Sequence, residues 1–243
     1  MGESAVRLNG LCGGYGSMQV IWDVDMTVQS GQSVVLLGAN GAGKSTILRL
    51  IMGMLPATKG QVMLFGAEAT RLRTDQRAKM GVAYMSEHAV FPSLTVEANV
   101  RLGAQRLDRK AVKRQVVESF ERFPELAERR RALAGDLSGG QRKLLGVAKC
   151  LASKPRLLIM DEPSSGLSPR YVSDIVVRLR DISRSGDLAL LIAEQNIAFL
   201  ELADQVSVVE GGTMRYSGTA DGLNNDEKLR AAFFGVASNE EAR

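Results

Sequence analysis

The sequence predicts an α/β fold, with a parallel sheet at its centre and an all-helical segment inserted into it. Short β-like runs alternate with helical patterns through most of the 243 residues. Two unbroken apolar runs, 157–160 and 188–193, are typical of strands buried on both faces of a parallel sheet. Between residues 95 and 153 the strand signal disappears and helical patterns dominate. These three observations define the expected architecture.

The remaining elements follow from local patterns in chain order. Alternating or short apolar runs predict strands, and apolar residues at helical spacing predict helices. The predicted strands are 6–11, 21–28, 33–37, 61–65, 81–85, 157–160, 188–193, 205–209 and 213–217. The predicted helices are one that begins at the 43–45 turn, then 111–120, 141–151 and a final helix near 226–234.

Composition excludes several classes of protein. The longest unbroken apolar run has six residues, 188–193, whereas a membrane-spanning helix needs roughly 20. Cys12 and Cys150 lie far apart without metal-binding spacing, which favours free thiols in a reducing cytosol. The formal net charge of +4 is too small to indicate nucleic-acid binding. Most of that charge lies in 108–131, where a solvated helix face is the first interpretation and proximity to anionic lipid the second.

A glycine-rich loop at residues 38–46, GANGAGKST, fits the phosphate-binding pattern G-x-x-x-x-G-K-S/T. It follows a predicted strand and opens a predicted helix, so successive N–H groups point into one concavity at a helix N-terminus. Lys44 is expected to reach the β- and γ-phosphates, and Ser45 to ligate Mg²⁺. A plain glycine-rich turn, the alternative, does not explain Lys-Ser at this offset. The predicted nucleotide-binding residues are Gly38, Asn40, Gly41, Ala42, Gly43, Lys44, Ser45 and Thr46.

Two carboxylates follow the buried strand in the segment LLIMDEP, residues 157–163. They emerge at the carboxyl end of the strand, where open α/β sheets bind ligands. Asp161 is predicted to hold Mg²⁺ through its water shell. Glu162 is predicted to polarise the attacking water as a general base, which contributes about 10²–10⁴-fold to a rate. A solvated strand end is the alternative, and the phosphate-binding loop upstream argues against it.

The segment LSGGQRK, residues 137–143, combines a helix start with two glycines. Ser138 and Gln141 are spaced as a capping box, which is a sufficient structural explanation for those two positions. Two glycines in the first helical turn are costly, however, unless something approaches the backbone closely. A bare helix N-terminus binds anions, and here the expected anion is the γ-phosphate of ATP. The predicted contacts are Ser138, Gly139, Gly140 and Gln141.

The loop, the LSGGQRK segment and the Asp-Glu strand occur in an order and spacing that resemble an ATP-binding cassette (ABC) ATPase over essentially the whole chain. The resemblance implies one ABC ATPase domain, 1–243, with a P-loop (RecA-like) core and an antiparallel β subdomain in 1–94 and 154–243. It implies a helical insertion, 95–153, that carries the signature motif. In that family two cassettes enclose two ATP molecules, so the signature is expected to act on ATP held by a second cassette.

Three further positions are interpreted through the same resemblance. Tyr15 stands where the family places an aromatic residue that stacks on adenine. Glu87 stands where most cassettes have a glutamine, and is expected to contact Mg²⁺ or its attacking water. Gln195 replaces the usual histidine, and its amide is expected to hydrogen-bond the γ-phosphate. The only histidine, His88, is not at the switch position.

The stretches VFPSLTVEAN, AEQN, DEPSSGLSP and LRAAFFG resemble the ATP-binding subunits of branched-chain amino-acid importers. This implies ATP and Mg²⁺ as ligands, integral membrane permease subunits and a second cassette as partners, and a solute-binding protein as an indirect one. The chain is then peripheral, at the cytoplasmic face of the inner (plasma) membrane. The SEHAV segment lacks the arginines usual there.

Other functions remain open from the residues alone. Urea, amides or another small solute are alternative cargoes, because other chains recognise the cargo. Soluble cassette ATPases that do not serve a transporter tend to carry two cassettes in one chain or a long coiled-coil insertion. This sequence shows neither feature, which argues against that class. A cassette that binds ATP without hydrolysing it is disfavoured, because Lys44, Ser45, Asp161 and Glu162 are all present. A GTPase is disfavoured because the sequence lacks the Asn-Lys-x-Asp segment that recognises guanine.

Overall fold

Two β-sheets build the core of the structure, a computed structural model that describes residues 3–184 and 186–224. The larger sheet has six strands in the order β10-β9-β3-β8-β7-β6. All neighbours pair in parallel except β10, which pairs antiparallel with β9. Its strands are β3 (Ser33–Leu37), β6 (Val82–Met85), β7 (Leu157–Asp161), β8 (Ala189–Glu194), β9 (Gln205–Glu210) and β10 (Thr213–Gly218).

The smaller sheet is antiparallel throughout and has the order β2-β1-β4-β5. Its strands alternate buried and exposed residues along much of their length, because only one face packs on the core. The strands are β1 (Ser4–Tyr15), β2 (Met18–Gln29), β4 (Ala57–Leu64) and β5 (Ala67–Glu68). This sheet confirms the antiparallel part of the fold inferred from the family resemblance.

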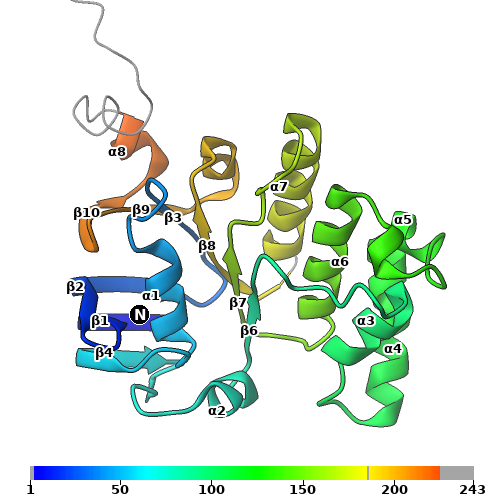
Figure 1. Cartoon of the computed structure of the whole chain (residues 1–243), viewed down its shortest axis with the longest axis horizontal. Helices are drawn as coiled ribbons and strands as arrows, with labels where there is room; N and C mark the ends of the chain where they lie inside the picture. Colours follow the sequence, from blue (N-terminus) through cyan, green and yellow to red (C-terminus); the bar gives the residue numbers. More distant parts are fainter. Residues whose placement is uncertain (1–2, 185, 225–243) are drawn as a thin grey trace, which may run out of the picture.

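The helix α1 (Lys44–Ile51) fills the space between the two sheets (Figure 1). Alternate residues of the buried central strands point to opposite faces. Val34 and Leu36 therefore join α1 and the antiparallel sheet in one apolar cluster. Val35 and Leu37 join a second cluster with the helices on the other face. Both faces of the parallel sheet are covered, which explains the unbroken apolar runs in its strands.

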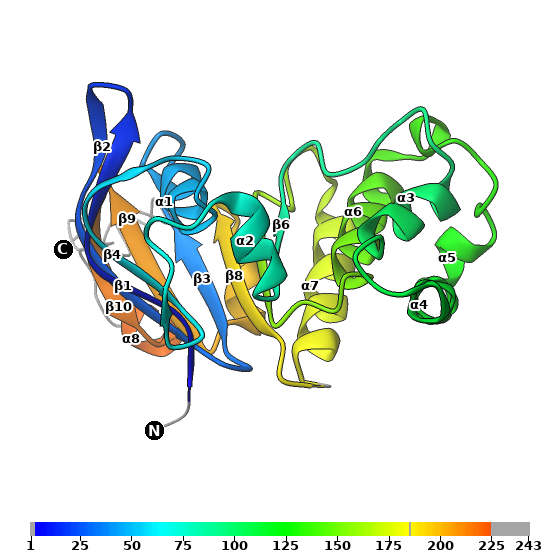
Figure 2. The same cartoon turned by 90° about the horizontal axis from the view of Figure 1, so that it is seen from below.

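A helical insertion lies between β6 and β7, and Figures 1 and 2 show it at the end of the molecule opposite the antiparallel sheet. Its first two α-helices begin at capping residues: Thr95 accepts from the Ala98 N–H, and Asp108 accepts from the N–H groups of Lys110 and Ala111. The basic side chains that begin α4 are exposed. The elements are α3 (Val96–Gly103), α4 (Arg109–Arg122), α5 (Pro124–Ala127), the 3₁₀ helix η1 (Ala134–Asp136) and α6 (Gly139–Leu151).

Four further helical elements complete the described chain. The longest, α7, places Val172, Ile175, Val176 and Leu179 on one buried face. It was not predicted from the sequence, although its apolar residues have clear helical spacing. The elements are α2 (Thr74–Lys79), α7 (Pro169–Arg184), the 3₁₀ helix η2 (Ile197–Leu202) and α8 (Ala220–Asn224).

Arg77 of α2 fixes the carboxyl end of α1. Its side chain is 1% exposed, and its guanidinium donates to the carbonyl oxygens of Leu50 (2.7 Å) and Ile51 (2.6 Å). Helix ends leave such carbonyls without partners, so a buried cation is a favourable cap there. The same guanidinium also donates to Thr70 and Leu72. Arg77 therefore holds α1 from the end opposite the phosphate-binding loop.

The α/β class with a helical insertion is confirmed. Strand β4 begins at Ala57, earlier than the predicted 61–65. The predicted helix near 226–234 lies outside the described residues. In the part of the chain that the structure describes, no helix combines the length and apolar character needed to cross a membrane.

Candidate nucleotide site

The loop between β3 and α1 has the backbone shape that its glycines allow. Gly41 and Gly43 have φ values of 81° and 109°, in the left-handed region. A Cβ on Gly38 would lie 2.5 Å from the carbonyl oxygen of Val209, so no side chain fits there. The loop ends at Lys44, where α1 begins. The loop thus leads directly into a helix N-terminus, the arrangement that binds phosphate.

Lys44 is buried beneath this loop. Its side chain is 3% exposed, and Nζ donates to the carbonyl oxygens of Gly38 (2.8 Å) and Ala39 (3.1 Å). Nζ also lies 3.8 Å from a carboxylate oxygen of Glu162. A buried ammonium needs such partners. The charge of Lys44 is thus held between the loop and the first carboxylate after β7.

Ser45 and Asp161 join the phosphate-binding loop to β7. The Ser45 hydroxyl donates to Oδ1 of Asp161 over 2.7 Å, and the Tyr84 hydroxyl donates to Oδ2 over 2.9 Å. Burial and the adjacent Asp161 carboxylate raise the pKa of Tyr84, which therefore stays a donor. No sequence motif indicated Tyr84. It lies here because β6 pairs in parallel with β7.

The Ser45 hydroxyl and the Asp161 carboxylate together supply two oxygen ligands that fit Mg²⁺. Both are hard oxygen ligands, and Mg²⁺ in nucleotide sites uses one or two such protein groups with water and phosphate oxygens. Among residues 3–184 and 186–224, no group of three or more His, Cys, Asp and Glu side chains is arranged to hold a metal. An ion completed by phosphate and water needs no such group.

Glu162 has a positive φ of 50°, uncommon for a residue with a side chain. Its backbone N–H donates to the carbonyl oxygen of Ala193 on the neighbouring strand β8 (2.9 Å). The carboxylate is partly exposed. A surface pocket brings together residues that are far apart in sequence: Asn40, Glu162, Ser164, Ser165, Glu194, Gln195 and Asn196.

The signature segment begins α6. Ser138 and Gln141 form the predicted capping box, with hydrogen bonds of 3.1 and 3.3 Å. A Cβ on Gly140 would overlap the Tyr171 ring at 2.5 Å, so packing within the chain already explains this glycine. A Cβ on Gly139 would meet only the Gly166 carbonyl, at 4.0 Å. Of these two glycines, therefore, only Gly139 lacks a packing contact within the chain that would require a residue without a side chain.

Gly139 and Glu87 line a cavity different from that of Gln195. Lys143 of α6 also lines it, and its Nζ donates to the Glu162 carbonyl oxygen (3.2 Å). Burial lowers the pKa of Lys143, and the nearby carboxylates of Glu87, Glu194, Glu162 and Asp161 oppose that shift. In the described part of the chain, Glu87 makes no hydrogen bond to Ser45 or Asp161. Its expected contact with Mg²⁺ stays a prediction.

Tyr15 lies at the end of β1, beside the first turn of α1. Its side chain is exposed enough for a planar ligand to reach the ring. Its hydroxyl lies 3.5 Å from Oγ1 of Thr46 and accepts a hydrogen bond from Arg49 (2.6 Å). The structure thus places Tyr15 next to the phosphate-binding loop. Arg49, which no sequence motif indicated, sets the position of its hydroxyl.

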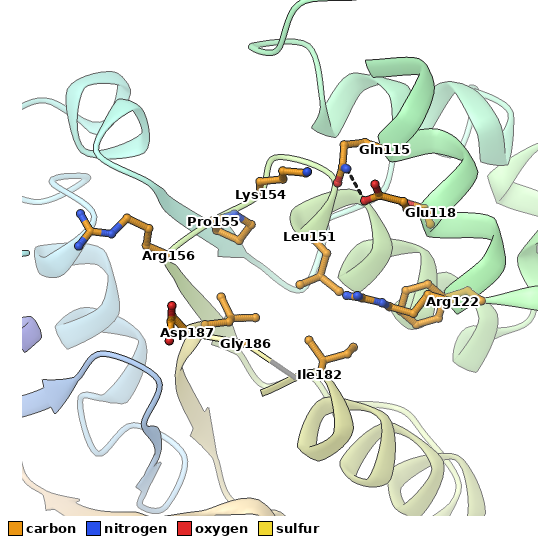
Figure 3. Close-up of a pocket in the computed structure, with 13 residues that line it drawn as sticks. Gln115, Glu118, Arg122, Leu151, Lys154, Pro155, Arg156, Ile182, Gly186 and Asp187 are labelled. Atoms are coloured by element: carbon orange, nitrogen blue, oxygen red, sulfur yellow. Dashed lines mark hydrogen bonds between the residues drawn. The ribbon is translucent and has the colours of Figure 1, made fainter. Parts of the chain in front are cut away.

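A further pocket, shown in Figure 3, lies away from these residues. Part of its lining, residues 154–156 and 186–188, immediately precedes β7 and β8. It therefore lies at the amino ends of the parallel strands. The nucleotide-site residues follow the carboxyl ends, where ligands bind in this class of sheet.

Comparison with known proteins agrees with this geometry. Residues 21–165 match the ABC transporter family. The chain is 35% identical over 233 residues to the probable branched-chain amino acid transport ATP-binding protein LivF of Archaeoglobus fulgidus, covering 95% of this chain and 98% of that protein. It is 36% identical over 222 residues to the high-affinity branched-chain amino acid transport ATP-binding protein BraG of Pseudomonas aeruginosa, covering 91% and 95%.

The fold is similar to that of a solved cassette. The ADP conformation of MJ1267, an ATP-binding cassette of an ABC transporter, superposes with a TM-score of 0.82 at 22% identity, covering 96% of this chain and 99% of that one. A phosphate-binding loop joined to paired carboxylates on a parallel sheet is typical of proteins that hydrolyse nucleotides. The chain belongs to the ABC transporter family and is an ATPase of that family.

The Tyr84–Asp161 hydrogen bond gives a test of how the site is built. Replacing Tyr84 with Phe leaves a buried acceptor without its donor, so we expect a loss of about 1–3 kcal/mol in the free energy of unfolding. Urea unfolding monitored by circular dichroism measures it. The control is Tyr171→Phe on α7, expected to change stability by less than about 0.5 kcal/mol. Equal losses of unfolding free energy in the two variants would show that the Tyr84–Asp161 hydrogen bond does not stabilise the site.

Proposed function

We propose that this chain hydrolyses ATP to drive an importer of branched-chain or other small amino acids. The proposal for hydrolysis is carried by the assembly of Lys44, Ser45, Asp161 and Glu162 at one edge of the sheet. The cargo is supported by the similarity to the two branched-chain amino acid transport ATP-binding proteins from Archaeoglobus and Pseudomonas. Glu87 in place of the usual glutamine and Gln195 in place of the usual histidine agree with the resemblance to branched-chain amino-acid importers.

The phosphates of ATP bind along residues 38–46 in this proposal. Backbone N–H groups at the α1 N-terminus hold the phosphate oxygens, and the adenine stacks on Tyr15. Lys44 exchanges its carbonyl partners for the β- and γ-phosphates. Ser45 and Asp161 hold Mg²⁺, directly and through water respectively. When bound there, Mg²⁺ would supply positive charge that stabilises the phosphate oxygens.

Glu162 acts as the general base for hydrolysis. Its carboxylate accepts a proton from water, the water oxygen bonds to the γ-phosphorus, and the bond to the bridging oxygen of ADP breaks. Lys44 Nζ lies 3.8 Å from a carboxylate oxygen of Glu162. Gln195 lines the same pocket as Glu162, and its amide hydrogen-bonds the γ-phosphate. Gln195 cannot supply a protonated imidazole, so the proton chemistry is left to Glu162.

The site is completed by a second cassette. In one chain, Gly139 does not line the pocket of Asn40, Glu162 and Gln195 but a neighbouring cavity that shares Ser165 with it. Gly139 is also free of internal contacts that would require a glycine. Both features support a signature helix whose N-terminus meets the γ-phosphate held by a partner. Permease subunits bind this pair at the cytoplasmic face of the membrane, and a solute-binding protein delivers the cargo.

Glu162→Gln tests the general base. We expect steady-state ATP turnover to fall about 10²–10⁴-fold, the usual contribution of such a group, while ATP binding is retained. A coupled assay of ADP release and a titration with labelled ATP measure the two quantities. Glu128→Gln, an exposed glutamate in the helical insertion, is the matched control. Near-normal turnover by Glu162→Gln would show that another group is the base.

Mixing two inactive variants tests the shared site. In Lys44→Ala the phosphate-binding loop is defective, and in Gly139→Asp a carboxylate repels the partner's γ-phosphate. A dimer with one copy of each contains one intact site, so we expect mixing to restore up to about a quarter of wild-type turnover. The separate variants should be inactive. A mixture that stays inactive would contradict pairing between two copies of this chain.

Transport assays test the cargo. The chain is reconstituted in proteoliposomes with its permease subunits and binding protein, and uptake of labelled leucine, urea and acetamide is compared. We expect ATP-dependent leucine uptake that Lys44→Ala abolishes. Uptake of urea or acetamide in preference to leucine would overturn the amino-acid assignment and leave the ATPase assignment unaffected.

A further inference from the structure

Glu194, the last residue of β8, is a buried carboxylate that the proposed chemistry does not use. Its side chain is 2% exposed. No ion pair within residues 3–184 and 186–224 joins it to a lysine or arginine. Four donors surround it instead. They are the Ser164 N–H (2.7 Å), the Ser164 hydroxyl (2.9 Å), the Gln195 N–H (3.1 Å) and the Asn196 N–H (3.2 Å).

These donors belong to two separate segments. Ser164 follows Glu162 by two residues in the loop after β7. Gln195 and Asn196 follow β8. The Glu194 carboxylate therefore bridges the loop that carries the proposed base and the loop that carries the proposed γ-phosphate contact. Hydrogen bonds to an ionised acceptor are stronger than neutral ones, so the bridge is well suited to hold two loops together.

A second contact restrains the same loop. The Glu162 N–H donates to the Ala193 carbonyl oxygen (2.9 Å), directly before Glu194. The end of β8 thus holds the loop at two points, at the backbone of Glu162 and at Ser164. Pro163 between them has a fixed φ. Glu162 keeps a positive φ that few non-glycine residues adopt, and such a conformation persists where the surroundings enforce it.

We propose that Glu194 is a positioning residue, which clamps Ser164 to the Gln195 backbone and so sets the Glu162 carboxylate relative to Gln195. The inference rests on the proposed role of Glu162 as the base. Glu194 itself is turned away from solvent and acts through the two loops. Removing the carboxylate of Glu194 should therefore lower the rate of the chemical step. ATP binding, which depends on residues 38–46, should be maintained.

Glu194→Gln tests the clamp with little change in shape. The amide keeps one acceptor oxygen but places an NH₂ group against donors, so at least one loop loses its hold. We expect kcat to fall about 10- to 100-fold, because small misplacements of catalytic groups have effects of that size. The KM for ATP should change less than about threefold, since uniform binding is retained. Steady-state kinetics, binding of labelled ATP and thermal unfolding are measured together.

Two further variants make the test specific. Ser164→Ala removes one of the four donors and should lower kcat less than Glu194→Gln. In the Glu194→Gln background it should have almost no further effect, because the two residues form one interaction. Glu201→Gln, an exposed glutamate on η2, is the control and should behave as wild type.

The outcomes separate this inference from the proposed function. If Glu194→Gln retains kcat while Glu162→Gln abolishes it, the clamp is wrong and the base assignment stands. A parallel loss of kcat, ATP affinity and thermal stability would reduce Glu194 to a general structural role and overturn the proposal. If Glu162→Gln itself remains active, the proposed base is wrong whatever Glu194 does.

Discussion

The parallel pairing of β3, β8 and β7 is the constraint on which the site depends. The register places Leu37 opposite Glu194, and Ala193 opposite Asp161. The three strands therefore end at one edge, and the loops that follow them meet there. The strands are buried on both faces, so a slip in register would move apolar side chains out of two cores at once. The hydrophobic packing of the sheet thus determines where the charged groups lie.

Charge balance at this edge follows from that placement. Lys44 is buried between the phosphate-binding loop and Glu162, while Asp161 receives hydrogen bonds from two hydroxyl groups. Lys143 of α6, in the helical insertion, donates to the backbone carbonyl oxygen of Glu162 in the loop after β7. Cations and carboxylates held within a few ångströms of one another lower the cost of burying each of them. The insertion therefore contributes to the electrostatics of the site as well as carrying the signature segment.

The sequence predicted the fold and the motif residues because their signals are local. GANGAGKST and the strand before Asp161 are readable from spacing and apolar runs alone. Tyr84, Arg49 and Glu194 were missed because their roles depend on partners far away in the chain, which only strand pairing brings close. The AEQN stretch drew attention to Gln195 through the family resemblance, although the adjacent Glu194 makes more contacts within the chain. For Gly140 the structure adds a second explanation, since packing against the Tyr171 ring also requires a residue without a side chain, and its contact with the γ-phosphate stays a prediction.

The most direct test of the account is the position of the metal ion when nucleotide is bound. Crystals of the Glu162→Gln chain grown with ATP and Mn²⁺ in place of Mg²⁺ would locate the ion by its anomalous scattering. We expect a peak about 2.0–2.3 Å from Oγ of Ser45, on the side of Asp161, with phosphate oxygens in its coordination shell. A nucleotide bound without the ion between Ser45 and Asp161, or phosphates held away from residues 38–46, would contradict the assignment of these residues to the nucleotide site.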